Sequence, residues 1–235
     1  LYSSPLEASR LFDDPRNVFF LQTCDWAEAM FRPWFGERQQ RWFGGYDMSD
    51  FQDARTLPKT WDVLVYDKIY LDRDTLYQQT IEPFLKKLDQ LGLTYTVIRY
   101  GAYHQKDYME KVRASRSTAF FAHSETQGMA YQECLATNVP IFAWDEGIWP
   151  HPSAIELGIG SAPCASVPCF DARCGTRFKI ADMMESWDAF HANLDKFEPR
   201  RFIAEEMTLQ KSAEAYLRAY RETAEAGAKL KRAPA

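Results

Sequence analysis

The sequence predicts an α/β protein with a Rossmann-like open parallel sheet and helices on both of its faces. Two observations support this fold class. Short apolar segments alternate with amphipathic segments through the centre of the chain, and the connections between them are short. A helix between two strands returns the chain to the same end of the sheet, so the strands pair in parallel. Four such units are too few for a closed eight-stranded barrel.

Four strands are expected where β-branched and aromatic residues cluster. They lie at residues 62–67, 94–100, 118–123 and 139–144. The segments between them predict helices at residues 74–91, 106–117 and 128–137. In the first of these, apolar residues recur every three or four positions. Gly92 and Asn138 are suited to end the first and third helices, since both residues tolerate the left-handed conformation of a helix C-terminus.

The segments before the central sheet form a separate unit in this prediction. Residues 17–22 predict a strand, and residues 25–34 predict a short helix. A polar, proline-containing stretch begins at Gly44-Gly45 and marks a boundary.

A long Ala-rich helix is expected near the other end of the chain. Thr208 is suited to cap it, and it runs to about residue 226. We expect this helix to pack on a surface through an apolar stripe, whose members are Ala213, Tyr216, Leu217 and Tyr220. The predicted division of the chain is therefore 1–45, 46–205 and 206–235.

Composition limits the class of protein and its partners. The 28 lysines and arginines and the 33 aspartates and glutamates give a net charge of −5, so no nucleic-acid partner is expected. Five cysteines are an odd number, which indicates free thiols in a reducing compartment. Cys164, Cys169 and Cys174 are spaced more widely than typical zinc-binding pairs, so no metal site is expected.

The sequence predicts a cytoplasmic location. No apolar run approaches the roughly 20 residues of a membrane span. The first residues also lack the charged and apolar regions of a signal peptide. The basic tail at residues 229–235 is expected to be a frayed end, and peripheral contact with the inner face of a membrane is the alternative interpretation.

The segment from His123 to Glu133 carries the residues best suited to chemistry. Gly128 stands where a helix should begin, and the N-terminus of a helix favours an anion such as a phosphate. Glu133 lies about one and a half turns further on, where its carboxylate could accept hydrogen bonds from a ribose diol. Glu125 precedes the helix and could hold hydroxyls of the group that the phosphate carries.

A structural interpretation of the same glutamates stands beside this one. Glu125 could be an N-terminal capping carboxylate, and Glu133 could be a solvated helix residue. Their common position at the end of an interior strand, with a glycine between them, favours the functional interpretation.

The Glu-x7-Glu spacing and the residues after it resemble a known family. Cys134-Leu-Ala-Thr-Asn-Val-Pro140 and a strand follow the second glutamate. This pattern is similar to that of the retaining glycosyltransferases of the GT-B fold, and most of all to family 4. The chain departs from the family pattern by having Cys134 and Asn138 at a small-residue and a glycine position. The resemblance covers about residues 40–222.

The resemblance implies roles for particular residues. Lys68 and Arg73 follow the first strand, where the family binds the donor diphosphate with an arginine and then a lysine; the order is reversed here. The resemblance places Tyr100 and Gly101 under the nucleotide base, and their alternative role is turn formation and core packing. The remaining implied roles fall on the predicted helix and the loop before it. They are diphosphate binding at Gly128, Met129 and Ala130, ribose binding at Glu133 and a catalytic role for Glu125.

The resemblance also implies an activity. It is the transfer of a sugar, with retention, from a nucleotide-diphosphate-sugar donor to a sugar or lipid acceptor, without metal or cofactor, in polysaccharide or glycolipid synthesis. Residues 46–205 would be the nucleotide-sugar-binding domain, 1–45 a remnant or edge of an N-terminal acceptor domain, and 206–235 a crossing helix and tail. One alternative is a non-catalytic nucleotide-sugar-binding module or an inactive donor-domain fragment. Another is a flavodoxin-like signalling domain that binds a divalent cation through Asp67, with Lys68 as its basic partner.

Overall fold

A five-stranded parallel sheet forms the centre of the molecule. The structure is a computed structural model that describes residues 5–149 and 162–230. The strands are β3 (Trp61–Lys68), β4 (Tyr95–Arg99), β5 (Ser115–Ala122), β6 (Ile141–Trp144) and β7 (Gly175–Phe178). Their order across the sheet is β4-β3-β5-β6-β7, and every neighbouring pair is parallel. The predicted fold class and its four strands are confirmed, and β7 is an additional edge strand.

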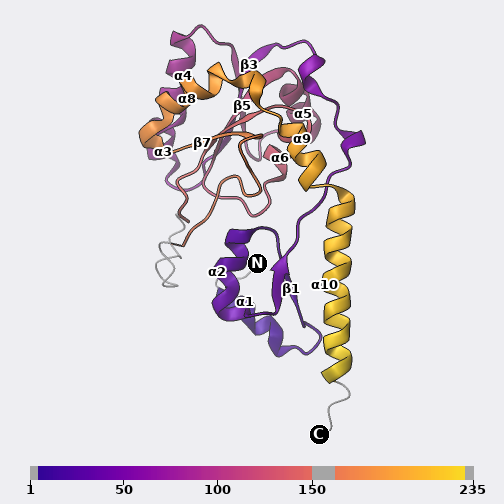
Figure 1. Cartoon of the computed structure of the whole chain (residues 1–235). Helices are drawn as coiled ribbons and strands as arrows, with labels where there is room; N and C mark the ends of the chain where they lie inside the picture. Colours follow the sequence, from indigo (N-terminus) through magenta and orange to yellow (C-terminus); the bar gives the residue numbers. More distant parts are fainter. Residues whose placement is uncertain (1–4, 150–161, 231–235) are drawn as a thin grey trace.

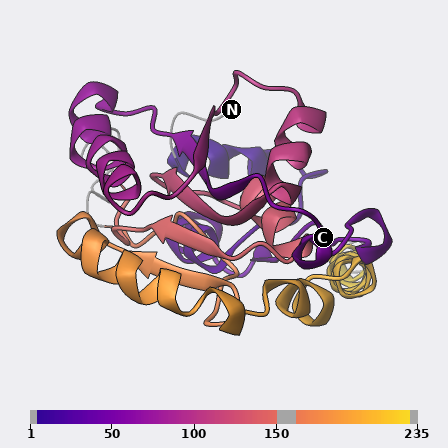
Figure 2. The ribbon, with the colours of Figure 1, turned by 90° about the horizontal axis from the view of Figure 1, so that it is seen from above.

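Helices cover both faces of this sheet (Figure 2). The side chains of β3 alternate between the two layers. Val63 and Val65 pack with α4 (Ile81–Gln90) and α8 (Met183–Ala192). Leu64 and Tyr66 pack with the layer that contains α5 (Gln105–Arg113), α6 (Met129–Ala136) and α9 (Pro199–Glu206). Because both faces are buried, the strand is almost continuously apolar.

The predicted helix at residues 74–91 is two helices in the structure, so this prediction is wrong in its detail. They are α3 (Arg73–Gln79) and α4, and Thr80 lies between them with φ −120° and ψ −75°. Pro83 explains the break. A proline lacks an N–H group and its ring clashes with the preceding turn of a continuous helix, whereas the first turn of a new helix accommodates it.

The predicted helix at residues 106–117 is also too long. Helix α5 ends at Arg113, and the next residues begin β5. Ser115 and Ser117 are fully buried in this strand, where their hydroxyls donate hydrogen bonds to the carbonyls of Lys111 and Asp62. Because these bonds satisfy the buried hydroxyls, polar residues can stand at the start of this buried strand. The sequence therefore has no apolar pattern there that would predict a strand.

Residues 5–41 form a smaller unit beside the sheet, which we call the first unit (Figure 1). It has a parallel strand pair, β1 (Phe20–Gln22) and β2 (Gln39–Arg41), with the helices α1 (Pro5–Ser9) and α2 (Asp25–Phe35). The strand expected within residues 17–22 and the helix expected at 25–34 are thus both present.

Helix α10 (Leu209–Leu230) leaves the central sheet and runs along the first unit (Figure 1). Thr208 caps it as predicted, since the Lys211 N–H donates to Thr208 Oγ1 at 3.2 Å. The predicted apolar stripe is only partly right: the Tyr216 ring packs edge-on against the Trp42 ring, with centroids 6.3 Å apart. Ala213, Leu217 and Tyr220 are exposed.

Small residues make the contact between α10 and the first unit. Ser212 and Ala219 are buried, and Ala215 is half-buried between them. The Ser212 carbonyl accepts from the indole N–H of Trp42 at 3.1 Å, and the Ala215 carbonyl accepts from the Gln40 amide at 3.3 Å. Small side chains on the helix allow Gln40 and Trp42 to reach its backbone carbonyls.

The two chain segments that connect the first unit and α10 to the central sheet cross side by side. The Tyr46 N–H donates to the Met207 carbonyl at 2.8 Å, and the Leu209 N–H donates to the Tyr46 carbonyl at 3.2 Å. A Cβ atom at Gly45 would overlap the Thr208 carbonyl, so this close approach requires glycine. We call this pair of crossings the joint.

Two further sequence predictions concern thiols and membranes. All five cysteines are free thiols, as predicted. Among the residues described, no helix combines the length and the apolar character that crossing a bilayer requires.

Candidate functional site

The carboxyl ends of β3 and β5 bring the first predicted site residues together. Lys68 ends β3 and is in register with Ala122, which ends β5. The Lys68 Nζ atom lies 2.5 Å from Glu125 Oε1, and the side chains are 18% and 12% exposed. Nζ also lies 4.4 Å from the centroid of the Tyr100 ring. Lys68, assigned to the diphosphate of a donor, and Glu125, assigned to its sugar, thus form one partly buried ion pair beside an aromatic ring.

The ion pair with Lys68 limits the rise that burial causes in the pKa of Glu125. Removal of the carboxyl from water raises its pKa, whereas the charge of Lys68 and its hydrogen bond lower it. Burial is the larger effect, so the pKa of Glu125 is raised. A group that displaced Lys68 from Glu125 would therefore favour protonation of this carboxylate.

Arg73 makes a different contact from the one proposed for it. Its two terminal nitrogens donate to the two oxygens of Asp67 at 2.8 and 2.6 Å, and Nη1 also donates to the Ile69 carbonyl at 3.0 Å. Asp67 is only 2% exposed. Two of the five guanidinium N–H groups remain outside these bonds, so diphosphate binding by Arg73 stays a prediction.

The turn before α6 is fixed by Gly128. Gly128 has φ +76° in the left-handed region, and a Cβ atom there would overlap the Tyr131 ring. The helix then begins with Met129, which is 62% exposed, and Ala130, whose carbonyl accepts from the Tyr108 hydroxyl. The first turn of a helix carries backbone N–H groups without intrahelical partners, which is the arrangement that suits an anion.

Glu133 is half-buried on α6, and it is not a freely solvated residue. Its Oε2 atom accepts a hydrogen bond from the Gln105 amide at 2.8 Å, which links it to the start of α5. Burial raises the pKa of Glu133, and the bond from Gln105 opposes this rise. Ribose binding by this carboxylate stays a prediction.

Glu133→Gln is expected to stabilise the protein at pH 7 and to have little effect at about pH 4. Because the pKa of Glu133 is higher in the folded than in the unfolded chain, the folded chain binds more protons above the ordinary pKa of 4.5. The contribution of this carboxyl to the free energy of unfolding therefore falls as the pH rises through that window. Glutamine removes the charge and keeps an acceptor for Gln105.

Urea unfolding of both proteins at the two pH values measures this difference. Glu110→Gln, on the exposed side of α5, is the control, because its side chain is 56% exposed. If Glu133→Gln changed the free energy of unfolding equally at both pH values, the change could not come from the charge of the carboxylate.

Tyr100 and Gly101 form the turn that follows β4. Tyr100 is 57% exposed, and its N–H donates to the Asp67 carbonyl at 2.8 Å. Gly101 has φ +80° with open space where a Cβ atom would stand. This turn therefore lies next to Lys68, and a role under a nucleotide base stays a prediction.

Contacts that the sequence did not reveal hold the loop between β5 and α6. The Glu125 N–H donates to the Ala165 carbonyl at 2.9 Å, and the Glu125 carbonyl accepts from the Trp26 indole N–H at 2.9 Å. The Gln127 amide donates to the Gly44 carbonyl at 2.8 Å and accepts from the Gly44 N–H at 2.9 Å. The loop that carries Glu125 is thus bonded to the first unit and to the segment that enters the joint.

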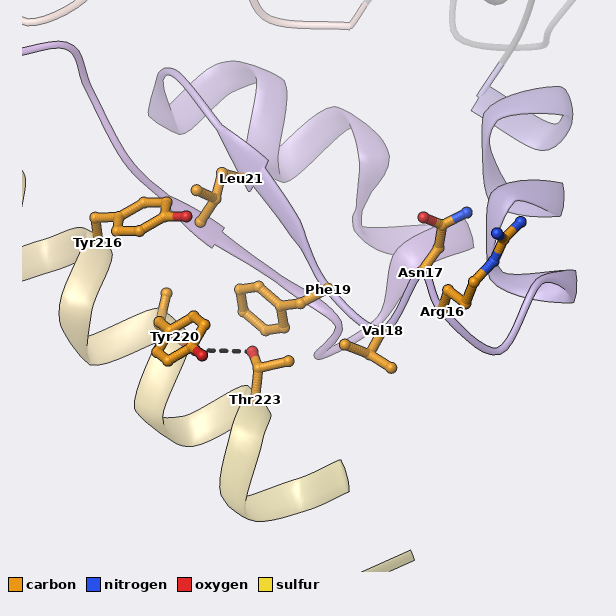
Figure 3. A pocket seen from close by; sticks show the side chains of 9 residues that line it. Arg16, Asn17, Val18, Phe19, Leu21, Tyr216, Tyr220 and Thr223 are labelled. Atoms are coloured by element: carbon orange, nitrogen blue, oxygen red, sulfur yellow. Dashed lines mark hydrogen bonds between the residues drawn. The ribbon is translucent and has the colours of Figure 1, made fainter. Parts of the chain in front are cut away.

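A separate groove of about 220 Å³ lies between the first unit and α10 (Figure 3). Phe19 and Leu21 face Tyr216 and Tyr220 across it. Among the described residues, its lining includes none of the predicted site residues. The groove is therefore distinct from the site at the ends of β3 and β5.

The fold is that of a GT-B-type Rossmann-like domain. No family model matches the sequence, and no curated protein matches it. Solved glycosyltransferase structures do match the fold. The pneumococcal O-GlcNAc transferase GtfA, solved with UDP and GlcNAc, has 12% identity and a TM-score of 0.53 over 91% of this chain and 47% of its own.

Two further solved structures support the same fold. A glycosyltransferase from Rickettsia africae has 10% identity and a TM-score of 0.59, over 95% of this chain and 68% of its own. Sucrose-phosphate synthase from Thermosynechococcus elongatus has 14% identity and a TM-score of 0.56, over 93% and 62%. The chain spans less than half the length of GtfA and of TarM, another matching structure.

Proposed function

We propose that the chain is the donor-binding part of a retaining glycosyltransferase that transfers a hexosyl group from a nucleotide-diphosphate sugar. The observation that carries the proposal is the partly buried Lys68–Glu125 pair at the edge of the sheet where α6 begins. Parallel α/β sheets bind ligands at this edge. The solved structure of GtfA with UDP and GlcNAc belongs to the same fold, which supports a nucleotide sugar as the ligand.

In this proposal the charged groups divide between the parts of the donor. Lys68, the remaining N–H groups of Arg73 and the start of α6 would stabilise the diphosphate as its negative charge grows. Glu133 would hold the ribose, and the turn at Tyr100 and Gly101 would lie under the base. Glu125 would position the donor sugar. The proposal includes no metal ion or cofactor.

The proposal extends to the parts of the chain. Residues 46–205 would be the nucleotide-sugar-binding domain, residues 1–45 part of an acceptor domain and residues 206–235 the crossing helix and tail. The acceptor would be a sugar or lipid in polysaccharide or glycolipid synthesis, and the tail would provide any contact with a membrane surface.

The alternative is a module that binds a nucleotide sugar without catalysis. The flavodoxin-like interpretation is disfavoured, because the Asp67 carboxylate that would bind a divalent cation accepts hydrogen bonds from Arg73 and from the Ile69 N–H.

Calorimetric titration with UDP, GDP and ADP tests nucleotide binding. We expect one of the three to bind, and Glu133→Ala to weaken it by about 10- to 100-fold, because hydrogen bonds to a charged group contribute about 1.5–3 kcal/mol each. Glu110→Ala, on the neighbouring helix, should bind as the wild type does. Equal binding by Glu133→Ala and wild type would contradict the ribose assignment. Absence of binding to all three nucleotides would contradict the nucleotide site. A separate assay for turnover of the sugar donor would distinguish an enzyme from a binding module.

A further inference from the structure

Trp26 lies far from Glu125 in the sequence and contacts it directly in the structure. It belongs to the first turn of α2, in the first unit, and its indole N–H donates to the Glu125 carbonyl at 2.9 Å. The two residues are 99 positions apart. This bond therefore brings the first unit to the loop that carries the candidate catalytic carboxylate.

The backbone of Glu125 is held on both sides. Its N–H donates to the Ala165 carbonyl at 2.9 Å, and Trp26 occupies its carbonyl. The side chain then reaches Lys68 Nζ at 2.5 Å. Because the backbone position sets where the carboxylate can lie, loss of either backbone bond would widen the range of positions that the carboxylate samples.

We propose that Trp26 is a positioning residue, which holds the Glu125 loop in the geometry needed to bind the sugar of the donor. The proposal rests on the proposed function and assigns to the first unit a part in donor recognition. Trp26 acts through the Glu125 backbone. The Trp26 bond ends on Glu125, which is assigned to the sugar, and not on the proposed diphosphate partners, so we expect its effect on the sugar part of the donor.

The molecule contains a matched control for this contact. Trp42, which follows β2, donates its indole N–H to the Ser212 carbonyl at 3.1 Å. Both bonds are partly buried, and both link a tryptophan near the first unit to a backbone carbonyl elsewhere. Only the bond from Trp26 ends on the Glu125 loop. Trp26→Phe and Trp42→Phe remove the same donor and keep an aromatic ring.

Amide hydrogen exchange tests the mechanical part of the proposal without a ligand. In Trp26→Phe we expect the amides of residues 124–126, which include the bonded Glu125 N–H, to exchange about fivefold to tenfold faster, as loss of one hydrogen bond would produce. In Trp42→Phe the same amides should exchange at the wild-type rate. Unchanged exchange in Trp26→Phe, or an equal increase in both variants, would overturn the positioning role.

Titration with UDP and UDP-glucose, and with the guanosine and adenosine counterparts, tests the functional part. For the nucleotide that the wild type binds, Trp26→Phe should keep its affinity for the nucleoside diphosphate and lose about fivefold to tenfold in affinity for the matching nucleotide glucose. Trp42→Phe should change neither. Equal loss for both probes would overturn the assignment to sugar binding. Failure of the wild type to bind any probe would instead overturn the proposed function, and the exchange result would still decide the positioning role.

Discussion

A Gly128→Ala variant is expected to lose about 2–5 kcal/mol of unfolding free energy and, with it, the binding of any nucleotide. Two costs add. An alanine in the left-handed region costs about 1–2 kcal/mol, and forcing a methyl group into a packed site costs about 1–3 kcal/mol more. The new Cβ atom would lie 2.6 Å from Tyr131 Cδ1 and closer still to the neighbouring ring carbon.

The Tyr131 ring cannot move away easily. It is fully buried, its hydroxyl donates to the Pro168 carbonyl, and the Gln132 amide donates to the same hydroxyl at 3.1 Å. Relief of the overlap must therefore come from the backbone of the turn, which is the segment proposed to contact the diphosphate.

Gly92→Ala is the control for Gly128→Ala. Gly92 also has a positive φ, of +66°, and open space where the Cβ atom would stand. The unfolding free energy of Gly92→Ala should fall only by the cost of placing alanine in the left-handed conformation, about 1–2 kcal/mol. Urea unfolding measures both variants. Equal losses would show that the overlap with Tyr131 has no energetic weight.

Glu125→Gln is expected to bind a nucleoside diphosphate more tightly and to lose turnover of the nucleotide sugar by about 100-fold or more. The carboxylate neutralises Lys68 at 2.5 Å. Glutamine has a similar shape and no charge, so Lys68 becomes available to the diphosphate, and a nearby negative charge is removed. The same change removes the charged group proposed to position the sugar.

Affinity by calorimetry and release of nucleoside diphosphate from the sugar nucleotide are the two measurements. Lys68→Met is the opposing variant, since it removes the cation and should weaken diphosphate binding. If Glu125→Gln weakened diphosphate binding as much as Lys68→Met did, the two residues would act together on the phosphate, and the separate assignment of Glu125 to the sugar would be wrong.

The fold could be predicted largely because the buried strands have a clear apolar pattern in the sequence. Val63 to Tyr66 are apolar on both faces of the sheet, which only an interior strand requires. The edge strand β7 was missed because Thr176 and Arg177 are polar and only partly buried or exposed there. Polar residues at a sheet edge carry no apolar pattern, so local sequence cannot distinguish them from a loop.

The candidate site could be predicted only in part for a related reason. Lys68 and Glu125 follow neighbouring parallel strands, so the topology alone brings them to one edge. Asp67 lies six residues before Arg73, close enough for the sequence to suggest the pair. Trp26 and Gln127 gave no such signal. Their partners are 99 and 83 positions away, and contacts at that separation depend on how the first unit sits against the sheet.

The contact between α10 and the first unit forms only after the central sheet has been synthesised. The strands β1 and β2 are synthesised before the five-stranded sheet, whereas α10, whose carbonyls accept the bonds from Gln40 and Trp42, is synthesised after it. A nascent chain that has emerged from the ribosome only as far as residue 207 would therefore carry all five strands of the central sheet next to a strand pair without its covering helix. The first unit therefore gains its α10 contacts only after all the strands of the central sheet have been synthesised.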